Sequence, residues 1–197
     1  MKQDTAIGVL DAIRARRTVR HYQPVAIDAA TVNRLLDAAV RAPTAMHREP
    51  WAFAIVQDRA LLARWSAQAK ALLVEQARAA GEFDTSHPMH AMLLDPAFNI
   101  FYEAGTLIII YRRHDEAYGL ADCWLAAENL MLAAVAEGLG SGCIGLALPL
   151  LNQAGTAEEL GIGPGYEAVV PIIVGLPASL PEASPRQPPD ILCWRPA

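Results

Sequence analysis

Three arginines gather within five positions at the end of an expected helix: Arg16, Arg17 and Arg20. Guanidinium groups stay charged and bind phosphate through paired hydrogen bonds, so the cluster is a candidate anion site. The competing interpretation is a solvated basic cap, which the helix dipole favours at a C-terminus. Arg186 lies in the proline-rich stretch 184–189, and it could deliver another guanidinium to the same anion.

Glycines recur in the stretch EGLGSGCIG, residues 137–145. The pattern is not the dinucleotide-binding GxGxxG, because here the helix precedes the glycines. A helix C-cap explains Gly138 and Gly140. Gly142 and Gly145 fall in an expected strand, where glycine indicates close approach by another backbone or a ligand. A flat ring system lying against the end of that strand would account for them.

The connection APTAMHREPWAF, residues 42–53, places two prolines, a histidine, a glutamate and a tryptophan between a helix and a strand. An unperturbed histidine titrates near ~6.5, so His47 is a candidate modulator of activity. In an extended segment His47 and Glu49 would share a face, and Glu49 would favour the charged imidazole. The alternative is that His47 caps the turn through a backbone hydrogen bond.

Other patterns predict no metal site and no catalytic side chain. His87 and His90 form an HxxH pair in a polar loop, without the further ligands that zinc sites use. The three cysteines are widely spaced and build neither a disulfide framework nor a zinc ribbon. Neither GxSxG nor HExxH occurs.

Length and composition favour one globular domain, residues 1–197, in the cytoplasm. The formal charge of −5 argues against nucleic acid as a partner, because phosphate contacts supply most of such affinity. No signal peptide is expected. The apolar segment 125–136 is too short and too polar to span a bilayer, so no membrane is expected.

Hydrophobic periodicity predicts the elements that position these residues. Helices are expected over 5–16, 28–42, 60–79, 120–139 and 149–160, and strands over 51–56, 106–111, 142–146 and 169–175. Asp28 is the expected N-cap of the second helix, with Ile27 and Val32 as a hydrophobic staple. Residues 81–99 lack a sustained period and are interpreted as a lid or excursion. The helix 120–139 is apolar on nearly all faces, which predicts burial against a partner subunit.

Taken together, these segments resemble the FMN-dependent nitroreductase family over nearly the whole chain. RRTVR (16–20) resembles the family's Arg-Arg-Ser-x-Arg motif. LLDAAVRAPTAMHREPWAFAIV is similar to its segment ending in Asn-x-Gln-Pro-Trp. AAENLMLAAVAEGLGSGCIG and PIIVGLP resemble the central helix with its following strand, and the last core strand. The order and spacing of the motifs make the resemblance specific.

The resemblance implies an α+β fold, with a central mixed or antiparallel sheet flanked by helices, in an intertwined homodimer. The C-terminal extension 177–197 would cross to the partner subunit, and each of two FMN sites would be built from both chains. Electrons would pass from NADH or NADPH to FMN and then to a small organic acceptor, such as a nitroaromatic or a quinone, by a ping-pong route.

The resemblance also assigns cofactor-binding roles along the chain. Arg16, Arg17 and Thr18 would hold the FMN phosphate and ribityl chain, and Arg186 would close over the phosphate. Arg20 would lie near the flavin N1–C2=O edge, where a cation favours reduction. The other positions are Pro43, Thr44 and His47 from the other subunit, and the backbone of Ile144, Gly145 and Leu146 near flavin N5.

Two positions depart from the family: its asparagine is His47 here and its glutamine is Glu49. The physiological acceptor and the choice between NADH and NADPH stay open. One alternative is a specialised flavin branch, a reductive dehalogenase or flavin-cleaving enzyme, with 81–99 as its lid. The other is a flavin-binding redox protein without turnover.

Overall fold

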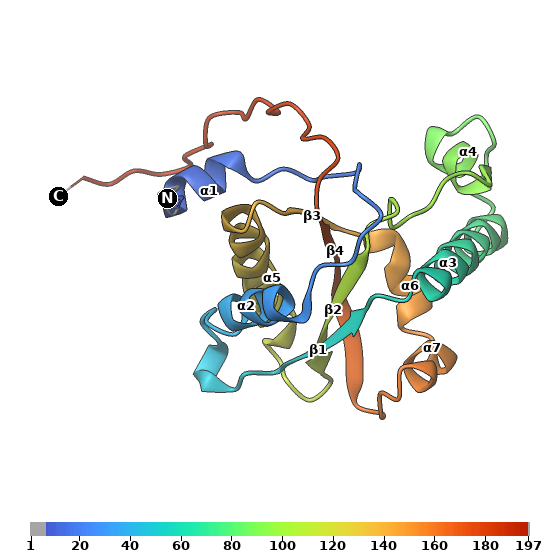
Figure 1. Cartoon of the computed structure of the whole chain (residues 1–197), viewed down its shortest axis with the longest axis horizontal. Helices are drawn as coiled ribbons and strands as arrows, with labels where there is room; N and C mark the ends of the chain where they lie inside the picture. Colours follow the sequence, from blue (N-terminus) through green and yellow to red (C-terminus); the bar gives the residue numbers. More distant parts are fainter. Residues whose placement is uncertain (1–6, 197) are drawn as a thin grey trace.

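A four-stranded antiparallel sheet in the order β1-β2-β4-β3 forms the centre of the computed structural model, which describes residues 7–196 (Figure 1). The strands are β1 (Trp51–Val56), β2 (Thr106–Arg113), β3 (Gly140–Cys143) and β4 (Tyr166–Gly175). Helices lie on both faces, which confirms the predicted α+β class, with an antiparallel sheet rather than a mixed one among these strands.

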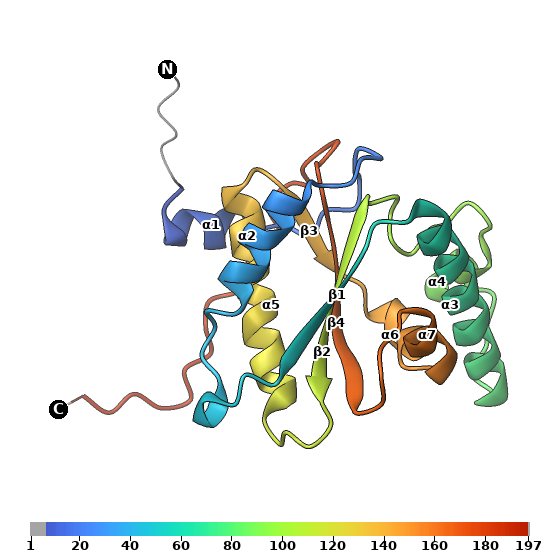
Figure 2. The ribbon, with the colours of Figure 1, turned by 60° about the horizontal axis from the view of Figure 1, so that its bottom comes forward.

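Two helical layers cover the sheet (Figure 2). α1 (Val9–Ala15), α2 (Ala29–Ala39) and α5 (Gly119–Ala136) lie on one face, and α3 (Arg59–Ala79), α4 (Pro88–Leu94), α6 (Leu148–Leu151) and α7 (Ala154–Glu159) on the other. Alternate residues of β2 serve the two cores: Leu107 and Ile109 pack with the α3 side, and Ile108 and Ile110 with α2 and α5. A strand buried on both faces reads as a continuous apolar run, which explains the sequence TLIIIY.

The start of α2 follows the predicted capping. The Asp28 carboxylate accepts a hydrogen bond from the Thr31 backbone N–H at 2.7 Å, and Ile27 and Val32 are buried in one cluster. An N-cap of this kind satisfies a backbone donor that the first helical turn leaves free. The helix ends at Ala39, three residues before the predicted boundary.

The helix α5 is buried on one side only. Ala126, Ala127 and Leu130 are fully covered by the sheet and α2, whereas Leu120, Trp124 and Leu125 are about half exposed, Trp124 at 47%. Within residues 7–196, α5 alone is long and apolar enough to cross a membrane, judged on length and composition. The core helix of a globular domain meets the same criteria, and α5 packs as such a helix.

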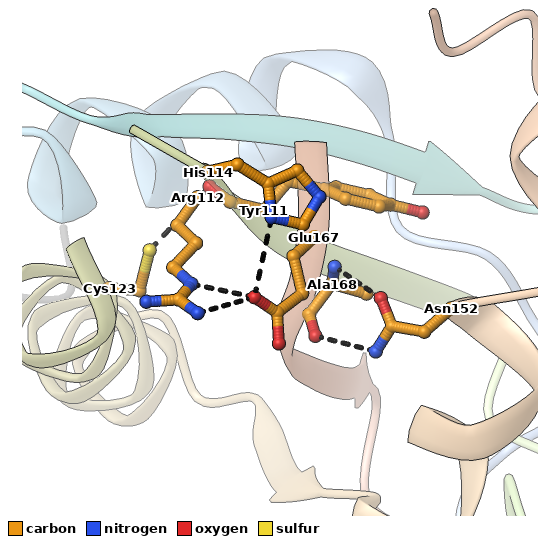
Figure 3. Close-up of polar contacts among 7 residues, drawn as sticks. All are labelled: Tyr111, Arg112, His114, Cys123, Asn152, Glu167 and Ala168. Carbon is orange, nitrogen blue, oxygen red and sulfur yellow. Dashed lines mark hydrogen bonds and ion pairs between the residues drawn. The ribbon is translucent and has the colours of Figure 1, made fainter. Parts of the chain in front are cut away.

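A bulge in β4 is stabilised by one side chain from the end of α6 (Figure 3). Ile110 pairs with Val170 and Tyr111 pairs with Ala168, so Val169 is the extra residue. The Asn152 amide accepts from the Ala168 N–H at 2.8 Å and donates to the Ala168 carbonyl at 3.0 Å. Beside it, the Arg112 guanidinium forms a cross-strand pair with Glu167.

Several predicted boundaries were wrong. The predicted strand 142–146 is β3, Gly140–Cys143, followed by the 3-10 turn η2 (Gly145–Ala147), so Gly140 lies in a strand and not in a helix cap. Gly138, with φ of 72°, does end α5. The predicted helix 149–160 is divided into α6 and α7, because Gln153 between them adopts an extended backbone with φ of −77° and ψ of 138°. Residues 5 and 6 of the first predicted helix lie outside the described residues.

Candidate functional site

A cavity of about 640 Å³ lies between residues 13–20 and residues 181–186, two segments near opposite ends of the chain. Its lining is Ile13, Arg14, Arg16, Arg17, Thr18, Arg20, Glu128, Pro181, Glu182, Ser184 and Arg186. We call it the arginine cavity. The volume is within the roughly 300–1,000 Å³ of small-molecule sites. The predicted anion residues Arg16, Arg17, Arg20 and Arg186 therefore line one space.

Backbone pairing around β3 and β4 holds the two chain ends together. Thr18 pairs with Ser141, and the Val19 N–H donates to the Ser141 carbonyl at 3.0 Å. Four residues later Tyr22 pairs with Pro177, which directs the tail back toward α1 (Figure 1). The sheet thus fixes where the arginines of both segments meet.

Two glycines of β3 make this close approach feasible. A Cβ on Gly140 would lie 2.7 Å from the Val19 side chain, and one on Gly142 would lie 3.2 Å from Thr18 and 3.4 Å from the Val19 carbonyl oxygen. The sequence predicted close approach by another backbone or a ligand at Gly142. The structure shows that the approaching backbone is the segment that carries the arginines. A Cβ on Gly145 would contact nothing within 4 Å.

Positive charge dominates the arginine cavity, with five guanidinium groups against two carboxylates. Arg17 donates to the Arg14 and Arg16 carbonyls at 2.6 and 2.8 Å, which is the helix-cap role set out as the competing interpretation. Arg16 reaches Glu128 only at 3.6 Å. Within residues 7–196, Arg20 and Arg186 form no ion pair. Capping and anion binding are compatible, because the cap holds Arg17 at the cavity wall.

A second cavity of about 330 Å³ shares Arg20 with the first. The Arg20 guanidinium lies over the Tyr102 ring, 5.8 Å from its centroid, and Phe98 meets Tyr102 edge to face. Its full lining is Arg20, His21, Tyr22, Ala97, Phe98, Asn99, Tyr102, Glu103 and Ala178. Burial raises the pKa of Tyr22, whose hydroxyl has no hydrogen-bond partner in the described chain. Sequence reasoning missed this aromatic wall, although Phe98 and Tyr102 are four residues apart just before β2.

The connection 43–49 is not extended, so the predicted shared face of His47 and Glu49 was wrong. It forms the 3-10 turn η1 (Ala45–His47), with left-handed φ at Met46 (54°), His47 (54°) and Glu49 (46°). The Ala45 N–H donates to both oxygens of the buried Asp122 carboxylate at 3.2 and 3.3 Å. Among the described side chains, His47 makes no hydrogen bond and no ion pair with Glu49.

This connection lies at the opposite end of the α2–α5 layer from α1 in both views (Figures 1 and 2). Pro43, Thr44 and His47 therefore do not line the arginine cavity of their own chain. Ile144, Gly145 and Leu146 directly follow β3 and are not among the residues that line the arginine cavity or the second cavity. The Ile144 N–H donates to the Pro171 carbonyl at 2.9 Å. Gly145 and Leu146 open η2, where backbone N–H groups have no partner within the turn.

The nitroreductase family profile matches residues 13–176, which is most of the chain. The chain belongs to the nitroreductase family. The resemblance deduced from the motifs is thereby confirmed. Arg186 lies beyond the matched range, and the structure places it in the lining of the arginine cavity, with the arginines that the sequence grouped with it.

Similar proteins match this nitroreductase-family chain along nearly its whole length. A Methanothermobacter thermautotrophicus protein, provisionally named NADH dehydrogenase/NAD(P)H nitroreductase, is 28% identical over 91% of this chain and 80% of its own. A Bacteroides fragilis nitroreductase solved with bound FMN superposes with a TM-score of 0.79 at 25% identity, covering 96% of this chain and 100% of that one. An iodotyrosine deiodinase bound to FMN and 3-iodo-L-tyrosine shares the fold, with a TM-score of 0.73 at 22% identity over 93% and 97% of the two chains.

No metal centre accompanies the two cavities in the part of the chain that is described. Residues 7–196 bring no three His, Cys, Asp or Glu side chains together around a metal position. The His87 ring instead caps α4, accepting from the Met89 N–H at 3.3 Å, and lies 5.0 Å from the His90 ring. α4 packs against α3, on the face of the sheet opposite α1 (Figure 2).

Proposed function

We propose that this nitroreductase-family protein takes electrons from NADH or NADPH through bound FMN and passes them to a small organic acceptor by a ping-pong route. It is an FMN-dependent oxidoreductase by family. One observation carries the assignment of the site: arginines from segments near both ends of the chain line one cavity, and Arg17, Arg20 and Arg186 form no ion pair in the described chain.

The donor set of the arginine cavity fits a phosphate monoester. Guanidinium groups of Arg16, Arg17 and Arg186 offer charge-assisted hydrogen bonds, and the Thr18 and Ser184 hydroxyls lie in the same lining. FMN ends in a single phosphate. The glycines with GxGxxG spacing, residues 140–145, lie in β3 and at the start of η2 in an antiparallel sheet, and not in the strand-to-helix turn of a βαβ unit that receives a dinucleotide. The residues present therefore suit FMN rather than FAD.

In this assignment the arginine cavity receives the phosphate of FMN, and the second cavity lies on the side of its ring. Arg20 lines both cavities and therefore lies between the two parts of the site. Bound FMN supplies the hydride and electron chemistry, and the protein contributes placement and electrostatics. Arg20, held over Tyr102, offers a positive charge to the electron-rich edge of the ring. The backbone N–H groups of Gly145 and Leu146 are donors available to the ring nitrogen that receives hydride.

We propose a homodimer in which Pro43, Thr44 and His47 complete the site of the partner subunit. The arginine cavity of one chain lacks these residues, and apolar side chains stay exposed on α1, on α5 and along the tail. They are Val9, Leu10, Ile13, Leu120, Trp124, Leu125, Ile191, Leu192 and Trp194. Such a surface is larger than scattered single residues would make, which favours burial in an interface. The C-terminal extension would cross to the partner, with Trp194 as its anchor.

The oligomer has a direct test. Light scattering should give the mass of two chains, and deletion from Pro188 onward should loosen both the dimer and the bound FMN while leaving Arg186 in place. A stable monomer fully loaded with FMN would contradict the proposal. We also propose a cytoplasmic location, where reducing conditions would keep Cys123, Cys143 and Cys193 as free thiols.

The proposed reaction is tested with the purified protein. Heat release followed by chromatography should yield FMN, and anaerobic titration with NADH and NADPH should bleach the flavin spectrum. A screen of nitroaromatics, quinones and halogenated aromatics then identifies the acceptor. FAD as the main cofactor, or a colourless protein, would overturn the assignment. Bleaching without turnover on any acceptor would favour a redox protein, and selective dehalogenation would favour the specialised branch.

A further inference from the structure

The segment 95–103 is fastened to α3 by two buried polar side chains, Ser66 and Lys70. They lie one helical turn apart, so they point from the same face of α3. Ser66 is 3% exposed and Lys70 is 9% exposed. This segment carries Phe98, Asn99 and Tyr102, which line the cavity that shares Arg20.

Lys70 is a buried cation without a carboxylate partner in the described chain. Its ammonium group donates to the Asp95 and Phe98 carbonyls, both at 2.7 Å, and lies 5.9 Å from the centroid of the Phe98 ring. A buried charge is costly unless hydrogen bonds satisfy it. The two short bonds therefore indicate a specific fastening, since a lysine on a helix surface would otherwise extend into water.

Ser66 fastens the next turn of the same segment. Its hydroxyl oxygen accepts a hydrogen bond from the buried Ile100 N–H at 3.0 Å. The segment itself is a series of tight turns in which the Asn99 side chain bonds the Phe101 N–H at 2.9 Å and the Glu103 carboxylate at 2.8 Å. Tyr102 and Glu103 adopt left-handed φ of 52° and 58°. Side chains with left-handed φ persist only where the surrounding structure holds them.

We propose that Lys70 and Ser66 are positioning residues, which hold the 95–103 wall so that Tyr102 stays beneath the Arg20 guanidinium on the ring side of the flavin site. Neither residue lines the arginine cavity, and both bond the segment that lines the cavity sharing Arg20, so we expect them to act on the ring and not on the phosphate. The inference rests on the proposed function for the identity of the ligand, but the fastening of the wall is a property of the chain alone.

The test compares Lys70→Met, which keeps the stem and removes the donors, with Arg64→Met as a matched control. Arg64 lies on the same helix and pairs with Glu159, away from the segment. In hydrogen exchange of the proteins as isolated, the amides of residues 97–102 should exchange faster in Lys70→Met than in wild type, and they should be unchanged in Arg64→Met. Ser66→Ala should speed exchange chiefly at Ile100, and it provides the test if Lys70→Met fails to fold.

Flavin release gives the second measurement, with FMN bound or with riboflavin exchanged into the site. Lys70→Met should weaken retention of both flavins by the same factor, about tenfold for lost hydrogen bonds to a charged group. The visible circular dichroism of the bound ring should also change. A defect in stability alone would alter neither that band nor the local exchange pattern.

Unchanged exchange at residues 97–102 in both Lys70→Met and Ser66→Ala would overturn the proposal. Loss of FMN but not of riboflavin would also overturn it, because the effect would then lie at the phosphate. If the wild-type protein bound neither flavin, the proposed function would fail, and the exchange measurement would still decide whether Lys70 and Ser66 fasten the wall.

Discussion

The arginine cavity is assembled from segments far apart in the chain, whereas the connection 43–49 folds largely on itself. The cavity joins residues 13–20 to residues 181–186 through pairing at β3 and β4. The connection is a 3-10 turn with three left-handed residues that are not glycine. Its anchor points are Asp122 in the first turn of α5 and the Arg48–Glu116 ion pair at 2.8 Å.

The two regions also differ in how they use charge and strain. Arg20 and Arg186 form no ion pair among the described residues, so their charge is free for a ligand, while Arg48 is already paired. Each left-handed residue costs on the order of 1–3 kcal/mol, which Asp122 and its surroundings must offset. The exposed tip, with Met46 at 83%, faces outward. A preformed pocket and a rigid outward arm suit two halves of a site shared between chains.

The largest expected effect is a loss of FMN affinity when arginines that line the arginine cavity are replaced, compared with arginines elsewhere. Replacing Arg186 with alanine should weaken FMN binding about 10- to 100-fold, since one charge-assisted contact contributes roughly 1.5–3 kcal/mol. Arg17→Ala should weaken it at least as much, because Arg17 also caps α1. FMN fluorescence titration measures both variants.

Arg41→Ala is the control, because Arg41 pairs with Asp37 on the surface and lines neither cavity. Unchanged FMN affinity in Arg17→Ala and Arg186→Ala would remove the phosphate from this cavity.

A smaller effect is expected at the anchor of the connection. Asp122→Ala leaves the Ala45 N–H without its acceptor and should lower the free energy of unfolding by about 1–3 kcal/mol. Asp122→Asn keeps one acceptor oxygen and should lose less. Denaturant unfolding followed by far-UV circular dichroism gives both values. Equal stabilities of wild type and Asp122→Ala would mean that the turn stands without this anchor.

Acid should destabilise the fold through ion pairs that lie outside the arginine cavity and the connection 43–49. This effect should be smaller than that of Asp122→Ala, because exposed ion pairs contribute little. Hydrogen bonds from Arg34 lower the pKa of Glu137, and those from Arg64 and Trp65 lower the pKa of Glu159. Their stabilisation is complete above the ordinary carboxyl value of 4.5 and is lost as the pH falls through the lowered values.

Melting temperatures should therefore decline below about pH 4.5, and less steeply in Arg34→Met, which has already lost the Glu137 partner. Parallel acid profiles of wild type and Arg34→Met would rule out this pair as a source.

The smallest expected effect tests whether the connection reaches a cofactor at all. Measured between about pH 5.5 and 8.5, His47→Asn should change the pH profile of the reductive or the oxidative half-reaction, because an imidazole ring can bind a proton and a carboxamide cannot. Rapid-mixing kinetics of the two half-reactions in both proteins provide the profiles. Superimposable profiles would reduce His47 to a residue of the turn.

Local signals in the sequence predicted local structure well. Asp28 with Ile27 and Val32 placed the start of α2, and the apolar run 51–56 is β1. The family motifs predicted the fold, and they predicted that the arginines share one site. β2 continues to Arg113, two residues past the prediction, because Arg112 pairs across strands with Glu167. The hydrophobic periodicity of one strand gives no sign of a partner on another strand.

What could not be predicted depends on contacts between distant segments. Gly140 was assigned to a cap because its real neighbour, Val19, lies far away in sequence. The fastening of residues 95–103 by Lys70 was hidden for the same reason, since a lysine in a helix normally indicates a solvated face. The left-handed turn at 46–49 has no glycine to announce it.

The pairing of Thr18 with Ser141 and of Tyr22 with Pro177 has a consequence for the order of events during protein synthesis. Arg16 and Arg17 leave the ribosome well before β3, β4 and Arg186. Contacts between such distant segments form late in folding. The proposed phosphate pocket is therefore incomplete until Arg186 has been synthesised, and capture of FMN there would report that these distant segments have paired.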